Sequence, residues 1–230
     1  MLPYQCLLCG KEAEENAIFC SNCFSKISFI EQPICSICGR MFEFTVNDIE
    51  ETCNQCSDGT RFFDMARSLL HYDELSRQLI MKIKRHSDHI TACTCVKMLH
   101  TRYSDILERC DLVVPVPSHW TRLLRRSYNP ANIIAIELTK ISGKKYKNVL
   151  KRSKKTEYQR AKSIIERINN VLDAFSCKFD LNGKSVVLVD DVMTTGATLN
   201  ECAKVLKHAG AKKVICITIA CTRALCFNFG

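Results

Sequence analysis

The stretch that decides the fold runs from Val189 to Thr198 and reads Val-Asp-Asp-Val-Met-Thr-Thr-Gly-Ala-Thr. It overlaps the end of a largely apolar segment, 185–190. A second apolar run, 214–220, follows after a helical pattern that begins near Leu199. Continuous apolar runs are typical of strands that are buried on both faces of a parallel sheet. The stretch therefore predicts the turn between strand and helix in a strand–helix–strand unit.

The same stretch carries the residues that predict a ligand. Asp190 and Asp191 stand where the first strand is expected to end, at the edge where open α/β sheets bind ligands. The small and hydroxyl residues 194–198 then open a helix, and such a loop offers backbone N–H groups to a phosphate. The two carboxylates would repel that phosphate, but they suit vicinal hydroxyls or a hydrated Mg²⁺. We expect a ribose 5-phosphate site here, and a capped turn without a ligand is the alternative.

Further α/β elements are expected from about residue 63 onward. The pattern predicts a short strand at 67–72 and then a helix with apolar residues at Leu75, Leu79, Ile80 and Ile83 and a basic end. The apolar segment 111–117 predicts another strand, which is closed by proline. These elements indicate an α/β domain in which helices flank a parallel sheet.

Cysteines dominate the first part of the chain. Half of the sixteen cysteines occur there as four Cys-x-x-Cys pairs: Cys6/Cys9, Cys20/Cys23, Cys35/Cys38 and Cys53/Cys56. Such a pair lets a tight turn aim both thiolates at one tetrahedral metal, and a second pair completes the coordination. We predict two Cys₄ zinc ribbons with two structural zinc ions, because a redox motif would need only one pair at a strand–helix junction. Pairing in sequence order is favoured over crossed pairing.

Charge divides the chain at the same place. Residues 1–62 hold four Lys/Arg against nine Asp/Glu, and residues 63–230 hold 29 Lys/Arg against 15 Asp/Glu. We therefore predict a zinc-ribbon domain at 1–62 and an α/β domain at 63–230. A polyanionic partner would meet the basic domain.

The chain is expected to be cytoplasmic. No apolar run approaches the roughly 20 residues of a membrane-spanning helix, and the first residues lack the pattern of a secretory signal. Reduced cysteines fit that compartment.

These features together resemble the ComF/GntX-like family, in which cysteine ribbons precede a type I phosphoribosyltransferase-like domain. The resemblance rests on six segments: 72–84, the Val-Pro-Val-Pro strand at 114–117, 122–129, Thr156 with Gln159, Arg167 with Asn170, and the phosphoribosyl pyrophosphate (PRPP) signature at 187–198. It implies a bacterial protein of natural transformation. Such a protein would act on incoming single-stranded DNA with a helicase-like partner.

The resemblance also implies roles for particular residues. Asp190 and Asp191 would hold the ribose hydroxyls, and residues 194–198 the 5-phosphate. Lys84–Asp88 would correspond to the pyrophosphate loop, where cations neutralise a diphosphate bridged by Mg²⁺. The candidate catalytic residues are Asp190, Asp191, Lys84 and Arg126, with Arg122 and Arg125 as alternatives to Arg126. The candidate PRPP-binding residues are Asp190, Asp191, Thr194, Thr195, Gly196, Ala197, Thr198, Lys84 and Arg85.

Two departures from the family pattern bear on activity. Ser87 stands where relatives usually have the glycine that lets backbone approach the pyrophosphate. Pro130 follows Asn129 where relatives have glutamine, and proline removes a donor and a flexible link. No residue presents itself as the group that would recognise an acceptor base.

Two classes of function therefore stay open. One is a phosphoribosyltransferase that uses PRPP and Mg²⁺. The other is a non-catalytic sensor or single-stranded DNA-handling module that retains the phosphate site. The second class draws on Trp120–Tyr128, where arginines and aromatics interleave, and on the basic segment 140–162, although a solvated basic surface would have the same composition.

Overall fold

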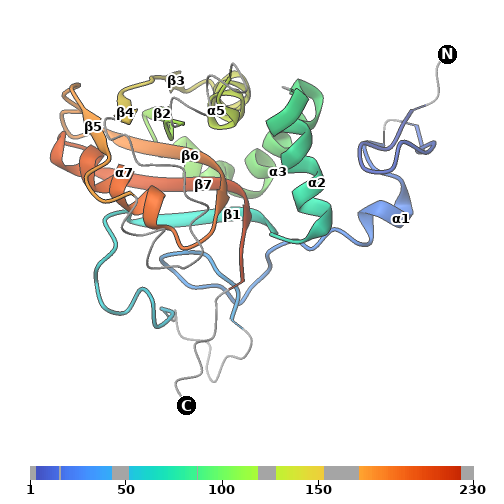
Figure 1. Ribbon diagram of the computed structural model, residues 1–230, viewed down its shortest axis with the longest axis horizontal. Helices are drawn as coiled ribbons and strands as arrows, with labels where there is room; N and C mark the ends of the chain where they lie inside the picture. The colour runs from blue at the N-terminus through green and yellow to red at the C-terminus, as the bar shows by residue number, and fades with distance from the viewer. Residues whose placement is uncertain are drawn as a thin grey trace.

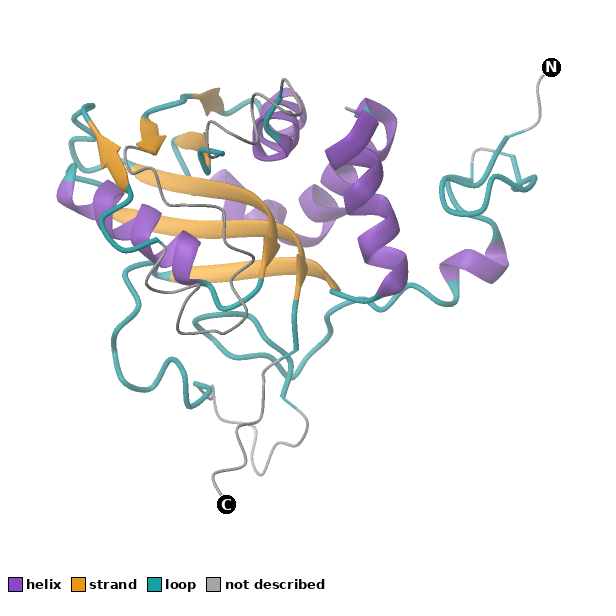
Figure 2. Cartoon of the chain, in the orientation of Figure 1, coloured by secondary structure: helices purple, strands orange, loops and turns teal. Residues whose placement is uncertain are grey.

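The computed structural model describes residues 4–15, 17–42, 52–86, 88–118, 128–152 and 171–223. Figure 1 labels the elements, and Figure 2 separates helices from strands. In chain order the elements are α1 (Ser21–Phe24), β1 (Met65–His71), α2 (Glu74–His86), α3 (His89–Glu108), β2 (Leu112–Pro115), α5 (Pro130–Ser142), β3 (Lys145–Tyr146), β4 (Leu150–Arg152), β5 (Phe175–Cys177), β6 (Ser185–Met193), α7 (Ala197–His208) and β7 (Lys213–Cys221).

Five strands form one parallel sheet in the order β1-β7-β6-β2-β3. Strands β4 and β5 form a separate antiparallel pair. The expected strand–helix–strand unit is β6–α7–β7, and its two strands pair directly. The α/β class and the parallel sheet predicted from the sequence are confirmed.

Strand β6 is longer than its sequence predicted. It was expected to end at Asp190 but continues to Met193, because β7 runs on beside it and pairs Val192 with Ala220. On its other side β2 ends at Pro115, opposite Val189. The carboxyl end of β6 therefore lies in the sheet with a strand on one side only.

Each face of the sheet has its own core. One face packs Val187 and Val189 against α2, α3 and α5, and the other packs Val186 and Leu188 against α7. Burying a Leu, Ile or Val side chain stabilises a fold by about 1.5–3 kcal/mol. Because α5 follows β2 on one face and α7 follows β6 on the other, the neighbouring strands β2 and β6 mark the topological switch point, where α/β sheets bind ligands.

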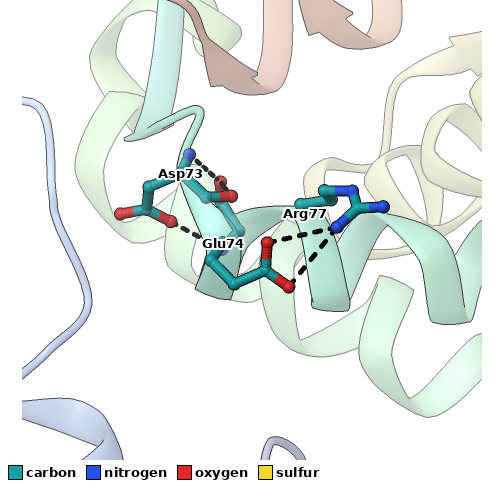
Figure 3. Close-up of polar contacts among 4 residues, drawn as sticks. Asp73, Glu74 and Arg77 are labelled. Carbon is teal, nitrogen blue, oxygen red and sulfur yellow. Dashed lines mark hydrogen bonds and ion pairs between the residues drawn. The ribbon is translucent and has the colours of Figure 1, made fainter.

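Reciprocal hydrogen bonds fix the start of α2, as Figure 3 shows. The N–H of Ser76 donates to Oδ1 of Asp73 (2.9 Å), and the N–H of Asp73 donates to Oγ of Ser76 (2.8 Å). Arg77 pairs with Glu74 one turn along, at 3.1 Å between Nη1 and Oε2. Leu79, Ile80 and Ile83 are buried as predicted, whereas Leu75 is half-buried. This packing fixes the direction in which the last turn of α2 presents its cations.

The two cysteine clusters lie at different places on the α/β domain. Figure 1 shows the first cluster around α1, beside α2, and the second below the sheet, next to β1. Cys6 and Cys23 share a core with α2, while Cys35 and Cys38 share the α7-side core. None of the helices in the described ranges combines the length and apolarity needed to cross a bilayer.

Candidate functional site

Asp190 and Asp191 lie at the end of β6 and point to opposite faces of the sheet, as successive strand residues do. Asp191 faces α2, where its Oδ2 is 3.0 Å from Nζ of Lys84. Asp190 faces α7, and its Oδ1 accepts a hydrogen bond from the N–H of Asp191 (2.9 Å). The two carboxylates therefore straddle the end of the strand at the switch point.

The charge of Asp190 reaches two thiols on the α7 side. Burial, and then the charge of Asp190, raises the pKa of both Cys202 and Cys216 well above the ordinary value. These thiols therefore stay protonated at neutral pH. They fill the core as small apolar groups and are not nucleophiles.

Lys84 and Arg85 lie in the last turn of α2, not in a loop. The structure thus brings one candidate pyrophosphate residue, Lys84, to the candidate ribose residue Asp191. Arg85 is exposed.

Asp88 begins the next helix, α3. Its Oδ1 accepts from the N–H of Thr91 (3.0 Å), and its Oδ2 accepts from Oγ1 of Thr91 (2.8 Å). Burial raises the pKa of Asp88, but the hydrogen bonds from Thr91 lower it by more, so the pKa lies below its ordinary value. The carboxylate of Asp88 therefore caps α3.

The loop 194–198 has the geometry of an anion cradle. Gly196 is the N-cap of α7 with φ of 79°, in the left-handed region that favours glycine. Thr195 Oγ1 accepts from the N–H of Ala197 (3.2 Å). Within the described part of the chain, the N–H groups of Thr195 and Gly196 donate to no protein acceptor. These donors, with the N-terminus of a 12-residue helix, favour a phosphate.

Arg40 and Arg61, which the sequence analysis did not single out, also reach this loop. Arg40 donates a hydrogen bond from Nη2 to the carbonyl oxygen of Thr194. Nη1 of Arg61 lies 3.5 Å from the position that a Cβ on Gly196 would take. Both arginines belong to residues 1–62. No spacing in the sequence links them to a loop more than 130 positions away.

The eight predicted metal ligands form two tetrads in sequence order. The four Sγ atoms of Cys6, Cys9, Cys20 and Cys23 lie within 4.8 Å of one another, and so do those of Cys35, Cys38, Cys53 and Cys56. The Sγ atoms of Cys9 and Cys20 are 3.8 Å apart, and those of Cys38 and Cys53 are 3.6 Å apart. Tetrahedral zinc with Zn–S bonds of about 2.3 Å places its sulfurs about 3.8 Å apart. Both tetrads fit zinc, and four thiolates make closed, structural sites.

Asn129 and Pro130 form the start of α5. Oδ1 of Asn129 accepts from the N–H of Ala131 (3.2 Å), and its Nδ2 donates to the carbonyl of Val116 (2.8 Å). The interpretation of Pro130 as a lost donor and link was wrong. As the first residue of a helix it needs no intrahelical donor, and its fixed φ suits that position.

Several sequence predictions fall outside the described residues. They concern Arg126 and its alternatives Arg122 and Arg125, with Trp120, Ser87, Thr156, Gln159, Arg167 and Asn170.

Comparison with known proteins identifies both parts of the chain. Residues 1–57 match the double zinc ribbon domain, and residues 123–225 match the phosphoribosyl transferase domain. Competence protein F of Haemophilus influenzae is 30% identical over 85% of this chain and 86% of its own length. Similar relatives are DNA utilization protein YhgH of Escherichia coli (26%, covering 85% of this chain and 86% of YhgH) and Competence protein ComFC of Bacillus subtilis (25%, covering 89% of each). With its two cysteine tetrads and its parallel sheet, the chain belongs to the family of Competence protein F, ComFC and YhgH.

Proposed function

We propose that this protein binds PRPP at the carboxyl end of β6 and serves a competence-related role in the use of incoming DNA. The observation that carries the binding proposal is the meeting of three groups at the switch point. These are the carboxylate pair Asp190 and Asp191, the open N–H groups of Thr195 and Gly196, and the cation Lys84. The role in DNA use is supported by the names of the relatives, two of which are competence proteins and one a DNA utilization protein.

Each group matches one part of PRPP. The 5-phosphate suits the N–H groups at the start of α7, and the ribose hydroxyls suit the carboxylates that straddle the end of β6. Lys84 would exchange part of its contact with Asp191 for the diphosphate, a stronger anion. The bound ligand would thus lie across the end of β6.

Magnesium would arrive with the diphosphate. Within the described ranges, the groups of three or more metal-ligating side chains are the two cysteine tetrads, so Asp190 and Asp191 do not form a magnesium cage by themselves. Mg²⁺ is usually held by one or two carboxylates together with substrate phosphates. The site therefore fits Mg²⁺ as a companion of PRPP, where it would neutralise diphosphate charge.

Phosphoribosyl transfer is the reaction that this site would support. The bond between C1 of the ribose and the diphosphate oxygen breaks, the diphosphate leaves with its electron pair, and an acceptor forms a new bond to C1. Lys84 would stabilise the charge on the leaving group.

Calorimetric titration of PRPP with Mg²⁺ into the zinc-loaded protein tests the proposal. We expect micromolar binding that an Asp190→Ala/Asp191→Ala double variant loses. The matched control is Glu14→Ala/Glu15→Ala, another adjacent acidic pair, which is exposed and lies in the first cysteine cluster. Equal binding by both double variants, or no binding by the unaltered protein, would contradict the proposal.

The non-catalytic DNA-handling alternative has its own support in the name of the YhgH relatives and in the excess of Lys/Arg over Asp/Glu in residues 63–230. Contact with DNA phosphates makes the logarithm of affinity fall linearly with the logarithm of salt concentration. Single-stranded DNA binding that shows this slope and survives the Asp190→Ala/Asp191→Ala change would favour this function. A flat salt dependence would exclude backbone contact.

A further inference from the structure

We propose that the second cysteine cluster is a working part of the phosphate site, because Arg40 orients the peptide between Thr194 and Thr195. This inference rests on the proposed function, since it assigns a positioning residue to the same site. It concerns side chains of the predicted zinc-ribbon domain, which were expected to bind metal only.

Arg40 is built into the hairpin of the second cluster. The N–H of Cys35 donates to the carbonyl of Arg40 (2.8 Å), and the N–H of Gly39 donates to the carbonyl of Cys35 (2.9 Å). Nη1 of Arg40 donates to Oε1 of Gln55, which lies between the two cysteines of the other pair (2.6 Å). The position of the guanidinium is therefore set by the same turns that gather the four sulfurs.

The hairpin lies directly against the sheet. The N–H of Ala66 donates to the carbonyl of Ile37 (2.6 Å), and Nη1 of Arg67 donates to the carbonyl of Ser36 (3.1 Å). A Cβ on Gly39 would lie 2.4 Å from the carbonyl oxygen of Ala66. The hydrogen bond between Ala66 and Ile37 joins backbone to backbone, so Arg40 reaches the loop from a fixed base.

Arg40 holds the Thr194 carbonyl on the side away from the cradle. Oγ1 of Thr222, which follows β7, donates to the same oxygen (3.2 Å). In a planar trans peptide the carbonyl of one residue and the N–H of the next point in opposite directions. The two donors on the Thr194 oxygen therefore fix the N–H of Thr195 so that it points away from them, toward the cradle. A cation on the carbonyl oxygen also polarises the peptide, which makes that N–H a stronger hydrogen-bond donor.

Arg40 is a buried cation whose charge is not balanced by a nearby carboxylate in the described part of the chain. The residue is 5% exposed, and no carboxylate in the described ranges forms an ion pair with it. Buried cations usually need a partner. Four thiolates around one divalent ion would carry net negative charge, and Arg40 follows Cys38 of that tetrad by two positions. A phosphate in the cradle would supply a second anion beyond the polarised peptide.

Arg61 extends the same contact. Oδ1 of Asn200 in α7 accepts from the N–H of Phe62 (2.7 Å), and Nδ2 of Asn200 donates to the carbonyl of Thr60 (3.3 Å). These bonds clamp the residues on both sides of Arg61 to the first turn of α7, beside Gly196. A guanidinium at the positive end of a helix is repelled unless an anion lies there.

The test measures the affinity of the full-length, zinc-loaded protein for ribose 5-phosphate and for PRPP with Mg²⁺. We expect Arg40→Ala to lower both affinities by the same factor, about tenfold or more, because the 5-phosphate is common to both ligands. Arg61→Ala should act in the same direction. Lys84→Ala is the contrasting variant: it should weaken PRPP far more than ribose 5-phosphate, because only PRPP carries the diphosphate.

Arg102→Ala is the matched control. Arg102 of α3 also links the domain to the N-terminal region, by donating from Nη2 to the carbonyl of Ile30, but it does not touch the loop. Thr222→Val removes the other donor to Thr194 without altering the cysteine cluster, so it keeps the inference testable if Arg40→Ala fails to fold. We expect Thr222→Val to weaken both ligands, and Arg102→Ala to weaken neither.

Amide hydrogen exchange of the segment 194–200 gives a readout without ligand. Faster exchange in Arg40→Ala and Thr222→Val, but not in Arg102→Ala, supports the inference. Unchanged exchange and unchanged ribose 5-phosphate affinity in both loop variants would overturn it. If the unaltered protein binds neither ligand, the proposed function fails, and exchange alone decides whether Arg40 orders the loop.

Discussion

At the scale of single residues, the ion pair between Lys84 and Asp191 would hold a cation in place for the proposed diphosphate at little energetic cost. The two side chains are 23% and 15% exposed, and their charged atoms are 3.0 Å apart. Such a contact fixes the orientation of both side chains. In the proposed complex, the diphosphate would replace one anion by another beside Lys84, so little desolvation would be required at that step.

Asp88 should stabilise the protein in a pH-dependent way. Its pKa is lowered in the folded state, so its contribution is present above the ordinary carboxyl range and is lost as the pH falls through the folded-state pKa. We expect Asp88→Ala to lower the free energy of unfolding by about 1 kcal/mol at pH 7. Chemical denaturation at a series of pH values measures this difference, which should shrink in acid.

Asp88→Asn is the control for that experiment, because asparagine caps a helix about as well but does not titrate in this range. Its stability should stay close to that of the unaltered protein at neutral pH. A loss from Asp88→Ala that is the same at every pH would show that the charge of Asp88 has no part in the cap.

At the scale of elements, the two cysteine knuckles are alike in sequence and different in their surroundings. Each places a glycine directly after a Cys-x-x-Cys pair, and both glycines have positive φ, 71° for Gly10 and 67° for Gly39. A Cβ on Gly10 would meet nothing within 4 Å, whereas one on Gly39 would meet the carbonyl oxygen of Ala66 at 2.4 Å. The first knuckle stands clear at this point, and the second lies on β1.

Alanine at these positions should therefore have unequal effects. Gly10→Ala carries only the left-handed backbone strain, about 1 kcal/mol. Gly39→Ala adds a collision with backbone that cannot rotate away, so we expect a clearly larger loss of stability and faster zinc release. Denaturation midpoints and a chromogenic zinc chelator measure both. Equal losses from the two substitutions would mean that the second hairpin is not seated on β1.

At the scale of the whole molecule, the two zinc sites are expected to have different consequences. The second tetrad places Arg40 against the carbonyl of Thr194, whereas the first packs beside α2, where the carbonyl of Leu7 accepts from Nζ of Lys82. Cys53→Ser and Cys9→Ser each disrupt one tetrad. We expect Cys53→Ser to lower ribose 5-phosphate affinity by about tenfold or more, as Arg40→Ala does, and Cys9→Ser to leave it unchanged.

Ribose 5-phosphate is the right ligand for this comparison because it lacks the diphosphate that Lys84 of α2 would contact. Zinc content measured on the same samples confirms that each variant has lost its intended ion. If both variants lose affinity equally, the zinc sites act through general stability, and the assignment of the second tetrad to the phosphate site is wrong.

The sequence by itself determined the parts whose causes are local. Cys-x-x-Cys spacing specifies which two thiolates a turn can aim at one metal, apolar runs specify buried strands, and small residues before α7 specify an N–H cradle. The end of β6 was misjudged because strand length depends on the neighbouring strand, and β7 extends beyond Asp190. Pro130 was misjudged because its effect depends on whether a helix begins there.

Only the tertiary structure decided which distant groups meet. The pairing of Lys84 with Asp191 follows from the packing of α2 on one face of the sheet, and the contact of Arg40 with Thr194 follows from the docking of a hairpin 154 positions away. Such contacts leave no periodicity or spacing in the chain, because each partner obeys only the local rules of its own element. Their free energy comes from packing and from hydrogen bonds formed after the elements assemble, and that assembly brings a metal-binding hairpin to the proposed phosphate site.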